Sequence, residues 1–188
     1  NLSHFKIDNF PYCQSDSSPN NHPSNKLIDK VSNLLKKQKI VGWYQGHGEI
    51  GPRALGNRSI LADPRDYEMK KRVNDIKQRE YFRPFGCSTI DDNFSKSDYM
   101  LYTNYIDKNK YPSITHVDNT CRHNTINNNF IFESLLKQFF QITQCKTLLN
   151  TSLNINGKPL ASDFDDAFVL FRSSSLDVLV YGDELYEK

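Results

Sequence analysis

Arginine side chains are concentrated in one segment whose backbone is interrupted by glycine and proline. The segment Gly51-Pro-Arg-Ala-Leu-Gly-Asn-Arg-Ser-Ile-Leu-Ala-Asp-Pro-Arg65 carries three arginines, and Lys77, Arg79 and Arg83 follow it. A guanidinium group donates paired hydrogen bonds to phosphate oxygens, and glycine lets backbone N–H groups approach an anion closely. We therefore expect this region to bind an anionic, phosphorylated ligand.

The excess of positive over negative charge is concentrated in this region. Residues 53–83 contain nine Lys or Arg and five Asp or Glu, although the whole chain has a formal net charge of only +2. A surface that coats nucleic acid is usually an extended basic stripe, whereas a local excess favours a discrete anion site. Nucleic acid is therefore not the expected partner.

The loop before the arginines contains Glu49, for which the sequence leaves several roles open. Its carboxylate could orient Arg53, coordinate Mg²⁺, or form a surface ion pair with Arg53 that has no further role. Lys77 and Arg79 lie at the expected end of a helix, where positive charge also interacts favourably with the helix dipole. A favourable interaction with the helix dipole would explain one of these cations but not Lys77, Arg79 and Arg83 together. Phosphate binding is therefore the favoured interpretation.

A second polar segment, Thr115-His-Val-Asp-Asn-Thr-Cys-Arg122, offers further reactive side chains. His116 and Asp118 could take part in acid–base chemistry or bind a metal, but a single histidine beside a strand more often forms a structural hydrogen bond. We therefore expect His116 and Asp118 to support the site and Arg122 to contact phosphate. We expect no metal site built from a cluster of side chains.

The segment Asn150-Thr-Ser-Leu-Asn154 follows a predicted buried strand. Ser152 and Asn154 point to the same side if the backbone is extended, because side chains alternate along a strand. They would then offer two polar groups to one ligand, although a capped turn would also account for them. No Ser-His-Asp order is present, so we do not expect Ser152 to be a nucleophile.

Hydrophobic periodicity predicts the elements that must position these side chains. A helix should begin after Pro23 with Ser24 or Asn25 as its cap, and bury Leu27, Ile28, Val31, Leu34 and Leu35. Further helices are expected over residues 66–78 and 130–142 and from Ser162 or Asp163 onward, and strands over residues 39–45, 58–62, 85–90, 114–117, 145–150 and 176–181. Because strands and helices alternate without a strict βαβ order, the sequence predicts a mixed-sheet α/β or α+β fold.

The chain as a whole reads as one domain with a polar extension. Its 188 residues suit a single domain, and residues 1–24 are rich in Ser, Asn, Asp and Pro, as in an arm or linker. Four scattered cysteines favour free thiols in a reducing compartment, and no apolar run is long enough to span a membrane. We therefore expect a cytoplasmic protein with no membrane partner.

These segments, in this order, resemble the C-terminal domain of the O-carbamoyltransferases that modify nodulation factors and antibiotics. The resemblance rests on Gly51–Arg65, on Lys77-x-Arg-Glu-x-Phe-Arg-Pro-Phe85, on Thr115-His-Val-Asp118 with Arg122, and on Asn150-Thr-Ser-x-Asn154. It implies a YrdC-like fold, a twisted mixed sheet flanked by helices, over residues 25–188. Three positions depart from the family pattern: Cys87 replaces a proline, Asn119 a glycine and Lys158 a glutamate.

The resemblance also implies an activity, in which ATP and carbamoyl phosphate give carbamoyl-adenylate with the help of Mg²⁺. Lys77, Arg83 and Ser152 would hold carbamoyl phosphate and the neighbouring ATP phosphates as catalytic residues. The other implied substrate contacts are Arg53, Arg79, Arg122, Asn150 and Asn154, and the implied supporting residues are Glu49, Asn57, Arg58, His116 and Asp118.

The family implies a partner as well, because its members carry an N-terminal sugar-kinase-like domain that passes the carbamoyl group to an acceptor hydroxyl. That domain would act in trans or be the missing part of a longer polypeptide. Two alternatives stay open: an RNA- or nucleotide-binding YrdC-like module without carbamoyl chemistry, and a degenerate domain kept for docking.

Overall fold

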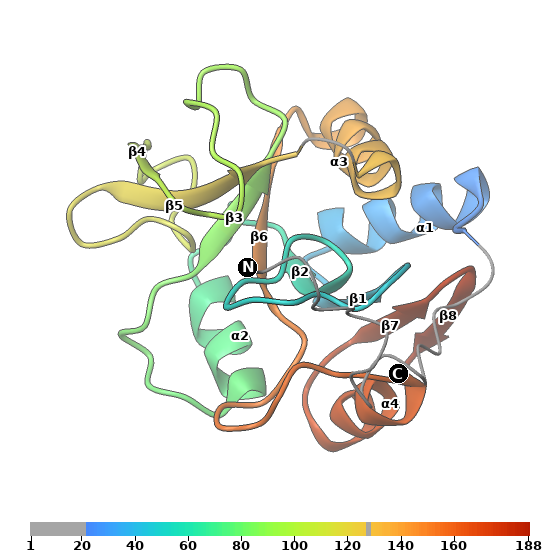
Figure 1. The fold of residues 1–188 in the computed structure, drawn as a ribbon. Helices are drawn as coiled ribbons and strands as arrows, with labels where there is room; N and C mark the ends of the chain where they lie inside the picture. Colours follow the sequence, from blue (N-terminus) through green and yellow to red (C-terminus); the bar gives the residue numbers. More distant parts are fainter. Residues whose placement is uncertain (1–21, 127–128) are drawn as a thin grey trace, which may run out of the picture.

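A computed structural model describes residues 22–126 and 129–188, and these residues form one eight-stranded mixed sheet with four helices (Figure 1). The helices are α1 (Asn25–Lys36), α2 (Met69–Lys77), α3 (Phe130–Thr143) and α4 (Phe164–Ser173). The strands are β1 (Val41–Tyr44), β2 (Arg58–Ala62), β3 (Gly86–Thr89), β4 (Thr103–Tyr105), β5 (Thr120–Thr125), β6 (Thr147–Ser152), β7 (Val178–Tyr181) and β8 (Glu184–Glu187). The expected mixed α/β fold is confirmed, whereas most of the expected arm, residues 1–24, lies outside the described residues.

The strand order is β4-β5-β3-β6-β2-β1-β7-β8. The pairs β1–β7 and β3–β5 are parallel, and the other neighbouring pairs are antiparallel. At the centre, β2 is buried along its whole length and β6 over its first four residues, because structure covers both faces of the sheet. The last two residues of β6, Thr151 and Ser152, are only partly buried. The strand therefore runs from the core to the surface and ends with the polar side chain of Ser152.

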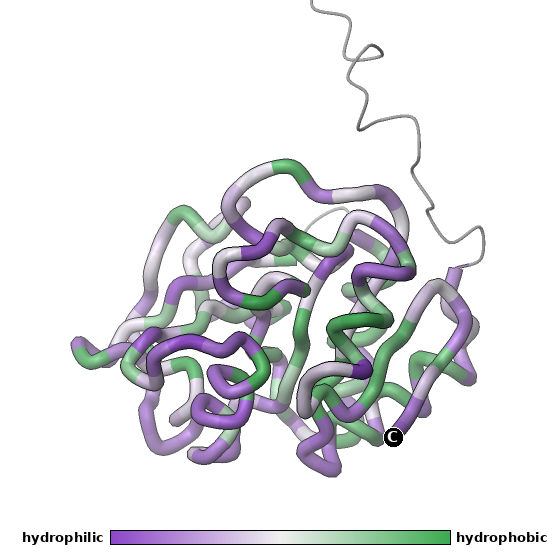
Figure 2. Tube along the Cα trace, turned by 90° about the horizontal axis from the view of Figure 1, so that it is seen from below, coloured by the Kyte–Doolittle hydropathy of each residue, from purple (hydrophilic) through white to green (hydrophobic). Residues whose placement is uncertain are grey.

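Helices pack on the sheet from both sides. In Figure 1, α1 and α3 lie side by side above β1, and α4 lies below β1 and β7. Figure 2 shows hydrophobic segments mostly towards the interior and hydrophilic ones along the outer loops. No helix in the described part of the chain is long and apolar enough to cross a membrane.

The first helix forms as its sequence predicts. The Ser24 side chain accepts a hydrogen bond from the backbone N–H of Leu27 at 3.3 Å and so caps α1. The five apolar residues that share its inner face, Leu27, Ile28, Val31, Leu34 and Leu35, are all buried.

The expected strand over residues 114–117 is wrong. Residues 112–114 form a turn in which the Thr115 hydroxyl donates to the Tyr111 carbonyl, and β5 begins only at Thr120. The β-branched residues suggested a strand, but Asn119 adopts a left-handed conformation (φ 61°) that closes a tight turn, with the N–H of His116 donating to the Thr120 carbonyl at 2.7 Å. The edge strands β4 and β8 were not expected from the sequence, because they are short and only partly buried.

Candidate functional site

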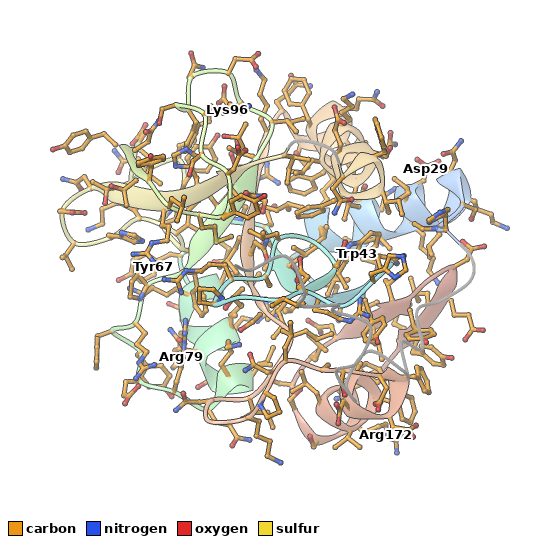
Figure 3. The ribbon with its side chains drawn as sticks, in the orientation of Figure 1. Asp29, Trp43, Tyr67, Arg79, Lys96 and Arg172 are labelled. Atoms are coloured by element: carbon orange, nitrogen blue, oxygen red, sulfur yellow. The ribbon has the colours of Figure 1, made fainter. Side chains whose placement is uncertain are left out.

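Most of the predicted site residues line one cavity of about 280 Å³. It lies where the segment after α2 meets the ends of β3, β5 and β6, and Figure 3 shows Arg79 beside α2. The lining residues are Pro52, Arg53, Ala54, Arg79, Arg83, Pro84, Phe85, Gly86, Met100, His116, Arg122, Asn150, Thr151 and Ser152.

Four guanidinium groups line this cavity, from Arg53, Arg79, Arg83 and Arg122, and no carboxylate lies among the described lining residues. Burial lowers the pKa of Arg53, and the positive charge of Arg122 lowers it further. Burial and the charge of Arg83 likewise lower the pKa of Arg79, against the opposing effect of Glu80, which pairs with Arg83 at 2.9 Å outside the lining residues. Because these cations destabilise one another, an anion in the cavity would relieve their repulsion.

Arg79 is held in place before any ligand arrives. Its Nε donates to Oδ1 of Asn74 at 2.7 Å, its Nη2 donates to the Pro84 carbonyl at 3.3 Å, and its guanidinium carbon lies 4.4 Å from the centre of the Phe85 ring. Asn74 is buried in α2, three residues before Lys77. This asparagine was not predicted from the sequence, although its helical spacing from Lys77 could have identified it.

Lys77 lies behind the cavity and is not among its lining residues. Its Nζ lies at hydrogen-bonding distance from four oxygens: the carbonyl (2.6 Å) and Oγ (3.0 Å) of Ser152, and the carbonyl (2.9 Å) and Oδ1 (2.7 Å) of Asn154. Burial, and to a smaller extent the charge of Arg79, lowers the pKa of Lys77 to about 7. Of these three residues, Ser152 alone lines the cavity.

The Ser152 and Asn154 side chains meet, but in a bend just after β6 and not along an extended strand, because the N–H of Asn154 donates to the Ser152 carbonyl at 2.9 Å. Oγ of Ser152 donates to Oδ1 of Asn154 at 2.6 Å, and Nδ2 of Asn154 donates to the carbonyl of Lys158 at 2.6 Å. The Ser152 proton is thus directed to Asn154 and not to a base, an arrangement unlike that of an activated nucleophile. Asn150, two residues before Ser152 in β6, also lines the cavity, and its side chain donates to the Ala54 carbonyl and to Oγ of Ser88.

Glu49 supports the loop that carries Arg53. Its Oε1 accepts from the N–H groups of Leu55 (2.7 Å) and Asn57 (3.2 Å), and its Oε2 accepts from that of Arg58 (3.0 Å). Burial raises the pKa of Glu49, against the opposing effect of these N–H donors. The carboxylate therefore binds the loop backbone, and the suggested Glu49–Arg53 ion pair is wrong.

Asn57 ends this loop and Arg58 begins β2, and both lie outside the arginine cavity. The buried Arg58 side chain donates to the Gln45 carbonyl at 2.7 Å and lies 3.4 Å over the ring of Tyr44. Asn57, Glu49 and Arg53 line a second, more open cavity of about 830 Å³ beside the N-terminus of α3. Arg53 therefore stands between the two cavities.

His116 and Asp118 are separated by the turn before β5. His116 lines the arginine cavity, and Asp118 lies on the exposed surface, where its Oδ1 accepts from Oγ1 of Thr120 at 2.7 Å. Met100, with a left-handed backbone (φ 56°), also lines the cavity and was not predicted, because its segment carries no clear periodicity. In the described part of the chain, no three His, Cys, Asp or Glu side chains are grouped as a metal site.

The fold defines the class of domain. The structure resembles Sua5 from P. abyssi with a TM-score of 0.62 and 13% identity, over 86% of this chain and 50% of that chain. It also resembles YciO from E. coli with a TM-score of 0.61 and 17% identity, over 89% of this chain and 84% of that chain. The expected YrdC-like fold is therefore confirmed.

Sequence comparison gives the family. Residues 32–188 match the family model described as "Carbamoyltransferase C-terminus", and the chain belongs to this family. The nodulation protein NolO of Bradyrhizobium diazoefficiens is 35% identical over 181 residues, which cover 88% of this chain and 33% of NolO. The 3'-hydroxymethylcephem-O-carbamoyltransferase of Amycolatopsis lactamdurans is 35% identical over 171 residues, which cover 85% and 33%. The chain thus spans about a third of the length of these relatives.

Proposed function

We propose that this domain forms carbamoyl-adenylate from carbamoyl phosphate and ATP, as the activating part of an O-carbamoyltransferase. One observation carries the proposal: four guanidinium groups and the Ser152 hydroxyl line one cavity that has no carboxylate among its described lining residues. Two phosphorylated substrates bring several negative charges together, and such a cavity offsets that charge. Membership of the carbamoyltransferase family supports the choice of carbamoyl phosphate as one substrate.

The reaction balances with one water molecule. Water attacks the phosphorus of carbamoyl phosphate, the bond between phosphorus and the bridging oxygen breaks, and phosphate and carbamate form. A carbamate oxygen then attacks the α-phosphorus of ATP, and pyrophosphate leaves with the electron pair of the broken P–O bond. The first step transfers a phosphoryl group to water, and the second transfers the adenylyl group of ATP to carbamate. The main tasks of the protein are therefore to position the reactants and to stabilise charge.

The residues divide these tasks by position. Arg83 and Arg122 would bind carbamoyl phosphate, and Arg53 and Arg79 the triphosphate, with Asn150 orienting the ligand from the buried wall. Lys77 acts through Ser152, because its Nζ is occupied by Ser152 and Asn154. The described lining residues contain no carboxylate pair for Mg²⁺, so the ion enters as the counter-ion of ATP, where it shields phosphate charge.

Transfer to an acceptor hydroxyl would require a second domain, which we propose to be the sugar-kinase-like domain. The relatives support this, since the chain corresponds to about a third of their length. Carbamoyl-adenylate would leave the arginine cavity towards that partner.

The proposal is tested by incubating the purified chain with Mg²⁺, carbamoyl phosphate and ATP and measuring pyrophosphate release. Release is expected, together with a thermal shift on addition of ATP. Arg83→Ala should abolish release, and Arg172→Ala is the matched control, because Arg172 is exposed on α4 and does not line the cavity. If no pyrophosphate appears and RNA binds in a salt-dependent manner without regard to ATP, the binding-module alternative is correct.

A further inference from the structure

Exposed hydrophobic side chains border the arginine cavity. Six of them, each at least 61% exposed, lie within two residues of one that lines the cavity: Ile50, Phe82, Tyr99, Leu101, Tyr102 and Val117. They come from four separate segments, and we call them the mouth patch. In Figure 1 the segment between α2 and β3 and the turn before β5, which carry Phe82 and Val117, both lie on the left of the molecule. One exposed hydrophobic residue is ordinary, whereas a group around one opening indicates a binding surface.

Hydrogen bonds fix the part of the mouth patch that follows Asp98. The N–H of Tyr99 donates to Oδ1 of Asn124 at 3.1 Å, and the carbonyl of Tyr102 accepts from the N–H of His123 at 3.4 Å. Tyr99 and the next residue both have left-handed backbones (φ 61° and 56°), which are unfavourable for a residue with a Cβ atom. The backbone therefore holds these exposed side chains in a defined position.

Two further members of the patch lie in turns. Val117 is in the tight turn before β5, and Phe82 is in a turn closed by a hydrogen bond from the N–H of Arg83 to the Glu80 carbonyl at 3.1 Å. None of the six side chains packs into the hydrophobic core of the described residues. Because their burial does not stabilise the fold, a partner explains their hydrophobic character better than folding does.

The composition and size of the patch suit a protein interface. Aromatic residues, methionine and arginine are enriched at the centres of interfaces. Here three aromatic members border a cavity that Met100 and four arginines line. An aromatic side chain carries roughly 150–250 Å², so the six together supply much of the roughly 800 Å² that each partner buries in a stable interface. A partner bound to the patch would cover the cavity.

The chemistry of the proposed product indicates which partner this is. Carbamoyl-adenylate is a mixed anhydride that water hydrolyses, so a partner that excludes water from the cavity would preserve it until transfer. The chain corresponds to about a third of the length of two relatives, which leaves two thirds for a domain that receives the product. A second copy of this chain would instead close two cavities against each other and leave the product no acceptor.

A membrane is a poorer match than a protein domain. The exposed carboxylates of Glu80 and Asp118 lie within two residues of Phe82 and Val117. Negative charge at this position is unfavourable against the anionic surface of a membrane.

We propose that the mouth patch is the docking surface for the sugar-kinase-like domain, and that docking seals the arginine cavity. Carbamoyl-adenylate then passes to the acceptor hydroxyl without entering bulk water. The choice of partner rests on the proposed function, and the residues that bind the partner are the new element.

The test compares two double variants of the whole chain. Phe82→Ser with Leu101→Ser removes patch members that are 77% and 68% exposed. Tyr67→Ser with Val169→Ser is the matched control, because these side chains are 72% and 62% exposed and lie more than two residues from any described lining residue. Loss of an exposed side chain leaves the core intact in both, and thermal unfolding would verify it.

The partner in this test is the two thirds of the A. lactamdurans 3'-hydroxymethylcephem-O-carbamoyltransferase that the chain does not match, produced as a separate polypeptide. Its Kd for the immobilised chain is measured by interferometry. We expect the patch variant to raise the Kd by about tenfold or more and the control variant to leave it unchanged.

Coupling between the two activities gives a second readout. With both polypeptides present, carbamoylated 3'-hydroxymethylcephem is measured per pyrophosphate released. The patch variant should release pyrophosphate as the wild type does, but transfer per pyrophosphate should fall by about tenfold, in step with the weaker binding. A structural role for these residues would lower both quantities together.

Each other outcome counts against a specific claim. A wild-type chain that releases pyrophosphate and does not bind the partner overturns the inference and leaves the proposed function intact, as does equal binding by the patch variant. Loss of pyrophosphate release in the patch variant also overturns it. So does a patch that instead mediates self-association, or binding to vesicles of phosphatidylcholine and phosphatidylserine. A wild-type chain that releases no pyrophosphate overturns the proposed function, whereas the docking surface is judged by binding.

Discussion

The Nζ atom of Lys77 lies 3.0 Å from Oγ of Ser152, although the two residues are 75 positions apart in the sequence. This contact joins the C-terminal end of α2 to the end of β6 and makes the Lys-x-Arg and Ser-x-Asn segments one structural unit. Lys77 faces inward to hold Ser152 and Asn154, while Arg79, two residues later, faces the cavity. The two cations therefore have different tasks.

The buried amine of Lys77 should make stability depend on pH. Its pKa is about 7 in the folded protein, against an ordinary value of 10.5, so between these values the unfolded chain binds the proton more tightly. The free energy of unfolding should thus rise with pH above about 7, by up to about 1.4 kcal/mol per pH unit from this group. Below pH 7 both states are protonated and this contribution is lost.

Lys77→Met should remove that slope and lower stability at alkaline pH most. Urea denaturation of both proteins at several values between pH 6 and 9.5 would measure the difference, with exposed Lys26→Met as the control. Parallel stability profiles for wild type and Lys77→Met would contradict this account of the buried amine.

Arg79 should be needed for function as an arginine and not merely as a cation. Lysine keeps the charge, but it lacks the planar group that lies over Phe85 and the separate Nε and Nη2 atoms that donate to Asn74 and Pro84. Arg79→Lys should therefore reduce pyrophosphate release by about tenfold or more, equivalent to about 1.4 kcal/mol, with a melting temperature close to wild type. Arg172→Lys, on the exposed surface of α4, is the control. Full activity in Arg79→Lys would show that this geometry is dispensable.

The Glu49 carboxylate should stabilise the loop that presents Arg53. Its two oxygens accept from three backbone N–H groups, and a glutamine side chain offers one acceptor oxygen in their place. Glu49→Gln should therefore lower the free energy of unfolding by about 1–3 kcal/mol and weaken ATP binding through displacement of Arg53. Glu68→Gln, whose side chain is exposed, should do neither. Denaturation and ATP-induced thermal shifts would measure both effects.

The sequence predicted the elements whose periodicity is strong and the side chains whose types are unusual. The inner face of α1 and the arginines of the cavity were found in this way, because apolar spacing and charge clustering are local signals. The start of β5 was missed because Asn119 adopts a left-handed conformation, which places a turn where a strand was expected. A glycine at this position would have indicated the turn, whereas asparagine adopts the conformation less often and so predicts it less clearly. The inward direction of Lys77 depends on contacts with β6, and no local pattern could indicate it.

Gly56 should be among the least replaceable residues of the site loop. Its φ of 111° is unfavourable for any residue with a Cβ atom, and a Cβ built there would lie 2.2 Å from Cδ1 of Phe132 in α3. Gly56→Ala must therefore shift the loop or the ring, at a cost of about 2 kcal/mol or more. Because Arg53 lies three residues earlier, affinity for ATP should fall as well. Gly48→Ala is the matched control in the same loop, since nothing lies within 4 Å of its added Cβ. Equal urea midpoints for the two alanine variants would mean that the contact between Gly56 and Phe132 does not constrain the loop.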